Sequence, residues 1–171
     1  MQATQVKLYS LSLRDTRTYL ATALFIAGNI VFPQLCHVAM HQGGLIFLPI
    51  YFFTLIGAYK CGLKVGLLTA VLSPIVNSFF FGMPPTAALP AILIKSVLLA
   101  GAAAMVAHRF KKVSLLALVA VVLFYQVAGC GFEWLLKGSF MASIQDFRLG
   151  VPGMLIQVIG GYVVLRYIIT K

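Results

Sequence analysis

The sequence predicts an all-α integral membrane protein, a single domain of six transmembrane helices over residues 1–171. Of its 171 residues, 61% are hydrophobic and only 9% are charged, and the mean hydropathy is +1.02. Soluble domains contain about 45–50% apolar and about 25% charged residues, so this composition excludes a water-soluble enzyme and a disordered chain. Because one membrane-spanning helix takes about 20 residues, six spans with short loops leave no room for a soluble domain.

Apolar runs that end at charge clusters or at Gly/Pro pairs define the six expected spans. Asp15 and Thr16 precede the first run and are residue types that begin helices. Pro49 and Pro90 lie near the starts of their spans, where proline is tolerated, and Pro74 predicts a kink in the third span. The expected spans are Thr18–Val38, Gly44–Tyr59, Val65–Phe81, Ala87–His108, Val113–Leu136 and Gly150–Ile169.

Basic residues predict the orientation of these spans. The chain has 13 lysines and arginines against three acidic residues. Ten of the basic residues precede the first span, join the second to the third, join the fourth to the fifth, or follow the sixth. Only Lys137 and Arg148 lie on the other side, and Lys95 lies inside the fourth span. The positive-inside rule therefore places both termini, including an N-terminal segment of residues 1–16, in the cytoplasm.

The excess of basic residues also has a consequence for partners. In a chain this apolar, it marks cytoplasmic loops that meet anionic lipid of the bilayer, and no nucleic-acid partner is expected. The first 20 residues are too polar to form the apolar core of a signal peptide, so we expect no cleaved signal.

Polar residues inside the spans mark candidate functional positions, because burying them in lipid is unfavourable. A polar site that opens outward explains why most of them lie at mid-depth or nearer the outer side. Hydrogen bonds between helices, each contributing about 0.6 kcal/mol, are the alternative for any single amide. The residues concerned are Asn29, Asn77, Lys95, Gln126, Glu133 and Gln157.

Lys95 and Glu133 are the only ionisable residues expected deep in the spans. They can pair across the fourth and fifth spans, although Lys137 lies four residues after Glu133 on the same helical face and competes for it. Two roles remain open: a structural ion pair, or a site where Lys95 meets a ligand carboxylate or carbonyl. Trp134 next to Glu133 is either an interfacial anchor or a surface on which a flat ligand ring stacks.

No residue pattern in the chain predicts catalysis or a cofactor. There is no Gly-rich phosphate-binding loop and no nucleophile with a matching base, so we expect no enzyme. Cys36, Cys61 and Cys130 do not form a disulfide framework. His37 and His41 are four residues apart, but no third ligand is evident and Gly43-Gly44 ends the helix, so no metal is expected. His41 is then a ligand contact, a gating residue or part of a solvated loop.

Small residues give the first span a smooth face. Ala23 and Ala27 are four residues apart, a spacing that permits close approach of another helix. Packing inside the bundle and docking to a partner protein both remain open for this stripe.

The middle of the chain carries four short motifs: Leu48-Pro49, Gly62 to Gly66, Ser73-Pro74 and Gly82-Met-Pro-Pro85. With the apolar runs between these motifs, the stretch of about Gly43–Ala107 resembles the substrate-binding S components of energy-coupling factor (ECF) vitamin transporters. In that family, a Leu-Pro segment opens the second helix, and a Gly-x-x-x-Gly-type turn follows on the cytoplasmic side. A Ser-Pro lies within the third helix, and Gly-Met-Pro-Pro caps the outer end of that helix. The chain has Tyr51 where the family often has His, and Lys95 where it often has an acidic residue. The resemblance therefore implies an architecture and a set of partners, but no particular vitamin.

The resemblance implies a subunit of the bacterial cytoplasmic membrane that captures a vitamin or vitamin precursor from the outer side. Its partners would be a membrane coupling subunit, docked on Ala23 and Ala27, and two ATP-binding subunits. The pocket would lie among spans four to six under the first and third outward loops. The expected substrate-binding residues are Lys95, Gln126, Glu133, Trp134, Gln157, Asn77 and His41. The alternatives are a stand-alone secondary carrier or channel for a small organic solute, and a membrane scaffold without a ligand.

Overall fold

The computed structural model describes residues 11–40 and 43–168, in which helices are the only regular elements longer than a single residue. Within these residues, four helices are long and apolar enough to span a membrane: α1 (Thr16–Ala39), α4 (Leu63–Phe81), α5 (Leu89–Phe110) and α6 (Leu115–Lys137). These helices confirm the first, third, fourth and fifth expected spans, with ends within two residues of the predicted ones. Asp15 caps α1, as expected, by accepting a hydrogen bond from the backbone N–H of Arg17.

The second expected span is broken, so the prediction of one continuous helix there is wrong. It consists of α2 (Gly43–Phe47), a 3₁₀ turn, η1 (Pro49–Tyr51), and α3 (Phe52–Cys61). Leu48 between them has a left-handed backbone, with φ of 46° and ψ of 45°. The residue before a proline is disfavoured in the right-handed helical region, so the helix ends before Leu48, and Pro49 begins the 3₁₀ turn that leads into α3.

The last part of the chain follows one helical path with two wider turns. Its elements are α9 (Val151–Leu155), the π-helical turn η2 (Ile156–Gly160), α10 (Gly161–Val163) and the π-helical turn η3 (Val164–Ile168). The end of the expected sixth span at Ile169 lies outside the described residues. Before this segment, the short helices α7 (Phe140–Ser143) and α8 (Gln145–Leu149) lie in the stretch that the sequence predicts as the third outward loop, Lys137–Arg148.

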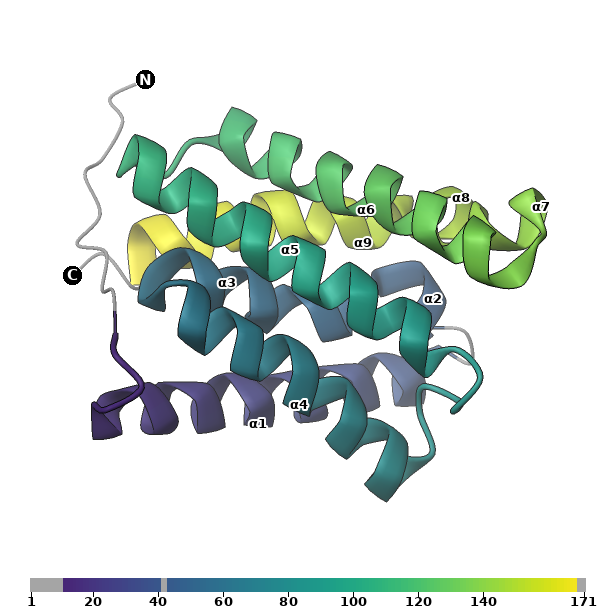
Figure 1. The fold of residues 1–171 in the computed structure, drawn as a ribbon, viewed down its shortest axis with the longest axis horizontal. Helices are drawn as coiled ribbons and strands as arrows, with labels where there is room; N and C mark the ends of the chain where they lie inside the picture. The colour runs from purple at the N-terminus through teal and green to yellow at the C-terminus, as the bar shows by residue number, and fades with distance from the viewer. Residues whose placement is uncertain (1–10, 41–42, 169–171) are drawn as a thin grey trace.

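The passes α1, α2–α3, α4, α5, α6 and α9–η3 run back and forth along one bundle (Figure 1). The start of α1 and the end of η3 lie at the same end of it, and α2, α7 and α8 lie at the opposite end. Connectivity brings most of the described basic residues to the end that holds the start of α1: Arg14, Arg17, Lys60, Lys64, Arg109, Lys111, Lys112 and Arg166. The residues of the N-terminal segment up to position 10 lie outside the described part.

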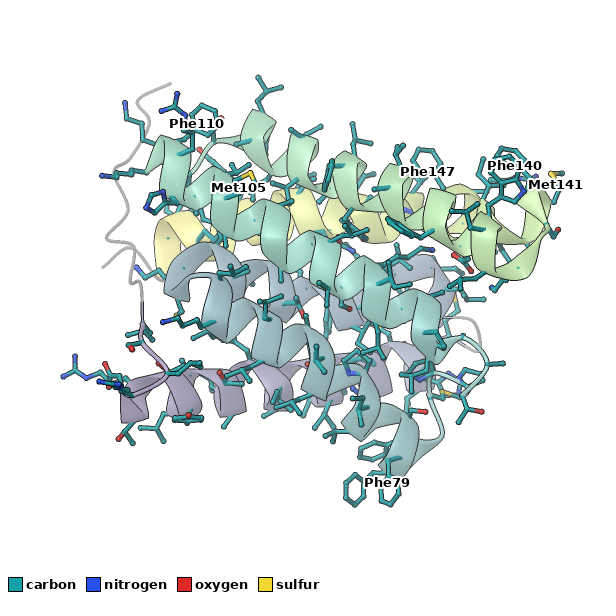
Figure 2. The ribbon with its side chains drawn as sticks, viewed as in Figure 1. Phe79, Met105, Phe110, Phe140, Met141 and Phe147 are labelled. Carbon is teal, nitrogen blue, oxygen red and sulfur yellow. The ribbon has the colours of Figure 1, made fainter. Side chains whose placement is uncertain are left out.

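The centre of the bundle is α3, which packs against α1, α4 and α5. Leu55, Ile56 and Ala58 of α3 are at most 1% exposed. The outer surface is also apolar: Phe79 and Leu135 are 81% and 80% exposed, and Phe79 projects from the end of α4 (Figure 2). A bundle that is apolar both inside and outside is typical of a protein surrounded by lipid, and the four long helices indicate a membrane protein.

Candidate binding site

Lys95 and Glu133 form an ion pair between α5 and α6. The Lys95 Nζ lies 2.6 Å from Glu133 Oε2, and the Lys137 Nζ lies 2.5 Å from Glu133 Oε1. The side chain of Lys95 is fully buried and that of Glu133 is 5% exposed, whereas Lys137 is 39% exposed. Lys95 and Lys137, the two partners that the sequence allows for Glu133, therefore both bind it. Glu133 thus binds two ammonium groups, one from α5 and one from its own helix, and forms an ion cluster with them.

Gly129 of α6 makes the room through which Lys95 reaches this carboxylate. A β-carbon at Gly129 would lie 2.4 Å from Lys95 Cγ and 3.2 Å from Cε. Such distances are far below van der Waals contact, so no residue with a side chain fits here unless Lys95 moves. The sequence shows a glycine at this position, but only the packing of α5 against α6 shows what it accommodates.

Gln126 lies two turns before Glu133 on the same face of α6. Its side chain is fully buried, and among the described residues neither its amide nitrogen nor its amide oxygen has a hydrogen-bond partner. The hydroxyl of Ser96, next to Lys95 on α5, is likewise buried and unpaired. Buried polar groups in proteins are nearly always hydrogen-bonded. A buried amide with both atoms unpaired is therefore a candidate contact for a polar ligand.

Gln157, on the π-helical turn η2, connects the last segment to the break in the second one. Its Oε1 accepts a hydrogen bond from Tyr125 OH (2.9 Å), and its Nε2 donates to the backbone carbonyl of Leu48 (3.4 Å). The Tyr125 ring lies 5.2 Å from the Tyr51 ring. The buried polar residues thus extend from α5 and α6 to η2. Sequence reasoning missed the Leu48 carbonyl, because a backbone group carries no sequence signal of its own.

Asn77 belongs to a different set of hydrogen bonds, between α1, α3 and α4. Its Nδ2 donates to the carbonyls of Asn29 (2.9 Å) and Ser73 (3.0 Å). The Asn29 Nδ2 in turn donates to Thr54 Oγ1 (2.9 Å) and Ser73 Oγ (3.1 Å). This network joins three helices and gives both asparagines hydrogen bonds that stabilise the bundle. The role of Asn77 in substrate binding stays a prediction, motivated by its unpaired Oδ1.

Trp134 lies near the ion cluster in sequence but faces another part of the surface. It is 51% exposed, and its ring packs edge-on against Phe140 of α7 with 5.8 Å between centroids. Both residues line an apolar pocket of about 290 Å³ between α6, α7 and α8. His41 lies outside the described residues. Within the described residues, no three histidine, cysteine or acidic side chains gather in a way that could hold a metal ion.

Ala23 and Ala27 lie on the outer face of α1. Both are exposed, and their neighbours Leu20 and Leu24 are 67% and 70% exposed. The stripe therefore does not pack inside the bundle, which leaves docking to another membrane protein or to lipid.

Comparison with known proteins gives no neighbour: no protein-family model, curated protein or solved structure matches the chain. The functional class must therefore come from the fold and the site. They define a helical membrane protein with a buried polar cluster that contains an ion pair, near the end of the bundle that holds α2, α7 and α8. Chemically, the unpaired amide can bind a polar ligand that carries a hydrogen-bond donor and an acceptor.

Proposed function

We propose that the chain is the membrane-embedded substrate-binding subunit of an ECF-type importer, and that it captures a vitamin or vitamin precursor from the outer side. The observation that carries this proposal is the Gln126 carboxamide, fully buried with both polar atoms unpaired within the described part of the chain. An unsatisfied buried polar group costs about 1–3 kcal/mol. A ligand that presents a donor and an acceptor side by side removes this penalty on binding, whereas a scaffold without a ligand would retain it.

The proposed topology has six membrane passes with both termini in the cytoplasm of a bacterial cell. The basic end of the bundle then faces inward, and the ion cluster lies near the outer end. Lys95 is about 9 Å along α5 from its start, and Glu133 is about 6 Å from the end of α6. The α2, α7 and α8 helices lie at the same end of the bundle (Figure 1). A ligand arriving from outside would reach the cluster after a short path.

The charge of the residues on the proposed outer side favours an anionic ligand. In the sequence, Lys95, Lys137 and Arg148 on that side stand against Glu133 and Asp146, so a ligand carboxylate would meet an excess of positive charge. A carboxylate-bearing vitamin or precursor is therefore the substrate class that the site fits best. The same excess of basic residues disfavours a cationic ligand.

The partners of the proposed importer supply energy that this chain cannot. Its 171 residues contain no Gly-rich phosphate-binding loop. We therefore assign ATP hydrolysis to two ATP-binding subunits, and their connection to this chain to a membrane coupling subunit. The exposed stripe of Ala23 and Ala27 on α1 is the proposed docking face for that coupling subunit, because small residues let two helices approach closely.

Co-expression with an ECF module and uptake into vesicles test the proposal. We expect the chain to co-purify with the coupling and ATP-binding subunits, and uptake of the ligand to require ATP. Uptake driven by a proton gradient, without the module, would replace the proposal by a stand-alone secondary carrier. If the chain neither associates with the module nor takes up the ligand under either condition, the membrane scaffold is the hypothesis that remains.

A further inference from the structure

An apolar pocket opens on the surface of the bundle, beside the outer half of α6. It has a volume of about 290 Å³ and is lined by Val127, Cys130, Gly131, Trp134, Phe140, Ser143, Ile144 and Phe147. The hydroxyl of Ser143 already donates to the carbonyl of Ser139. Pockets for drug-sized ligands measure roughly 300–1,000 Å³ and contain polar groups that orient the ligand. This pocket is small and offers almost none, so it is unsuited to a polar vitamin and suited to a hydrocarbon chain.

Two basic residues, Lys137 and Arg148, follow the pocket-lining residues of α6 and α8 in the sequence. Val127, Cys130 and Trp134 are spaced so that they lie on one stripe of α6, and Lys137 continues this stripe at the end of the helix. The Lys137 ammonium has three donors, of which Glu133 Oε1 takes one. On the other wall, Phe147 of α8 is followed directly by Arg148, which is exposed. Figure 2 shows Phe140 and Phe147 along the outer half of α6.

We propose that this pocket binds one acyl chain of an anionic phospholipid, whose phosphate contacts Lys137 and Arg148. The 23 residues of α6 span about 34 Å, close to the thickness of the hydrocarbon core. Lys137 at its end then lies at the level of the headgroups, and the pocket lies directly below, among the acyl chains. Trp134 occupies the depth at which tryptophan is enriched in membrane proteins. The inference requires only the membrane location, and it holds whether or not the chain takes part in vitamin import.

Trp134 is the only tryptophan of the chain, so its fluorescence reports on this pocket alone. The protein is reconstituted into phosphatidylcholine vesicles that contain a small fraction of phospholipid with brominated acyl chains, which quench tryptophan on contact. The brominated lipid is either phosphatidylglycerol, which is anionic, or phosphatidylcholine at the same mole fraction. We expect brominated phosphatidylglycerol to quench Trp134 as strongly as a severalfold higher fraction of brominated phosphatidylcholine.

Two glycine variants separate a pocket from a general attraction to anionic lipid. A β-carbon at Gly131, in the pocket, and one at Gly101, on α5 outside the pocket, would each meet no atom within 4 Å. Gly131→Leu fills the pocket, and we expect it to abolish the preference for phosphatidylglycerol. Gly101→Leu is the matched control and should preserve it. Equal quenching by the two lipids in the unchanged protein, or an equal preference in both variants, would overturn the proposal.

A third variant tests the headgroup contact. Arg148→Gln removes a cation without altering the pocket lining. Each lysine or arginine near an anionic headgroup enriches it about fivefold, so this variant should lower the preference by about that factor. An unchanged preference in Arg148→Gln would remove Arg148 from the headgroup site and contradict this part of the proposal.

Discussion

Lys95 on α5 lies directly against the α-carbon of Gly129 on α6. A β-carbon at position 129 would lie 2.4 Å from Lys95 Cγ, so the lysine stem occupies the space that any other residue would need. This contact directs the ammonium group to Glu133, one turn further along α6, at 2.6 Å. The ion cluster therefore depends on a residue that takes no part in its charge.

The first prediction concerns this contact. Gly129→Ala should push Lys95 out of its position and destabilise the protein by about 1–3 kcal/mol, the usual range for an overpacked core. Gly131→Ala, two residues further on, is the control, because its β-carbon would meet no atom within 4 Å. It should be neutral or stabilising by up to about 1 kcal/mol, as alanine favours a helix over glycine. Melting curves of both variants in one detergent make the comparison, and equal shifts would show that Lys95 is not held at Gly129.

The second prediction concerns the ion pair. Removing one partner of a buried pair typically costs about 3–5 kcal/mol, but in Lys95→Met the remaining carboxylate keeps Lys137 as a partner. We therefore expect a smaller loss, of about 1 kcal/mol or more. The double variant Lys95→Met/Glu133→Gln should be more stable than the sum of the single effects, by about 0.5–3 kcal/mol. Additive effects in a double-mutant cycle of unfolding free energies would mean that the pair contributes nothing.

A ligand role for Lys95 gives a separate expectation. Hydrogen bonds to charged groups contribute about 1.5–3 kcal/mol, so Lys95→Met should weaken ligand binding by about tenfold or more. The affinity is measured by titration at a temperature where the variant is folded. Binding that stays unchanged while the melting point falls would make the pair purely structural.

The third prediction compares the effect on stability of removing the unpaired amide of Gln126 and the hydrogen-bonded amide of Asn29. Gln126→Leu removes two unsatisfied atoms and should stabilise the ligand-free protein by about 1 kcal/mol or more, while weakening ligand binding at least about tenfold. Asn29→Leu is the matched control. It loses the hydrogen bonds to Thr54 and Ser73 and should destabilise the protein. Thermal melting without ligand distinguishes the two, and a lower melting point for Gln126→Leu would indicate that Gln126 is a structural residue.

The fourth prediction concerns the outer face of α1. Ala23→Trp and Ala27→Trp each place an indole on an exposed position, so the fold and the melting point should not change. The bulk should hold a partner helix away and abolish co-purification with the ECF module. Leu135→Trp, at an 80% exposed position of α6, controls for the added ring. Retained co-purification in both alanine variants would move the docking face elsewhere.

Most of the fold could be predicted because hydropathy and helix length are set by the bilayer. The starts and ends of α1, α4, α5 and α6 follow from apolar runs bounded by polar or turn-forming residues. The break at Leu48 could not be placed, because Pro49 is equally compatible with the first turn of a helix. The π-helical turns over residues 156–160 and 164–168 also carry no composition signal, since their residues are as apolar as those of a regular helix.

The site could be predicted in its residue types but not in its pairings. Lys95 and Glu133 stand out because lysines and glutamates are rare inside spans. Whether an amide is satisfied depends on residues far away in sequence: Gln157 donates to Leu48, 109 positions earlier, whereas Gln126 has no partner among the residues that the structure describes. For the same reason the sequence placed Asn77 with the other polar residues, while the structure gives it partners on α1 and on its own helix.

Thermal melting of the purified protein with a panel of vitamins and their precursors tests the central claim most directly. A ligand at 100 times its dissociation constant stabilises the folded state by about 2.7 kcal/mol. We predict that one carboxylate-bearing member of the panel raises the melting point by an amount that grows with its concentration, and that Gln126→Leu removes this shift. If no member of the panel shifts the melting point of the unchanged protein, the chain is not a vitamin-binding subunit.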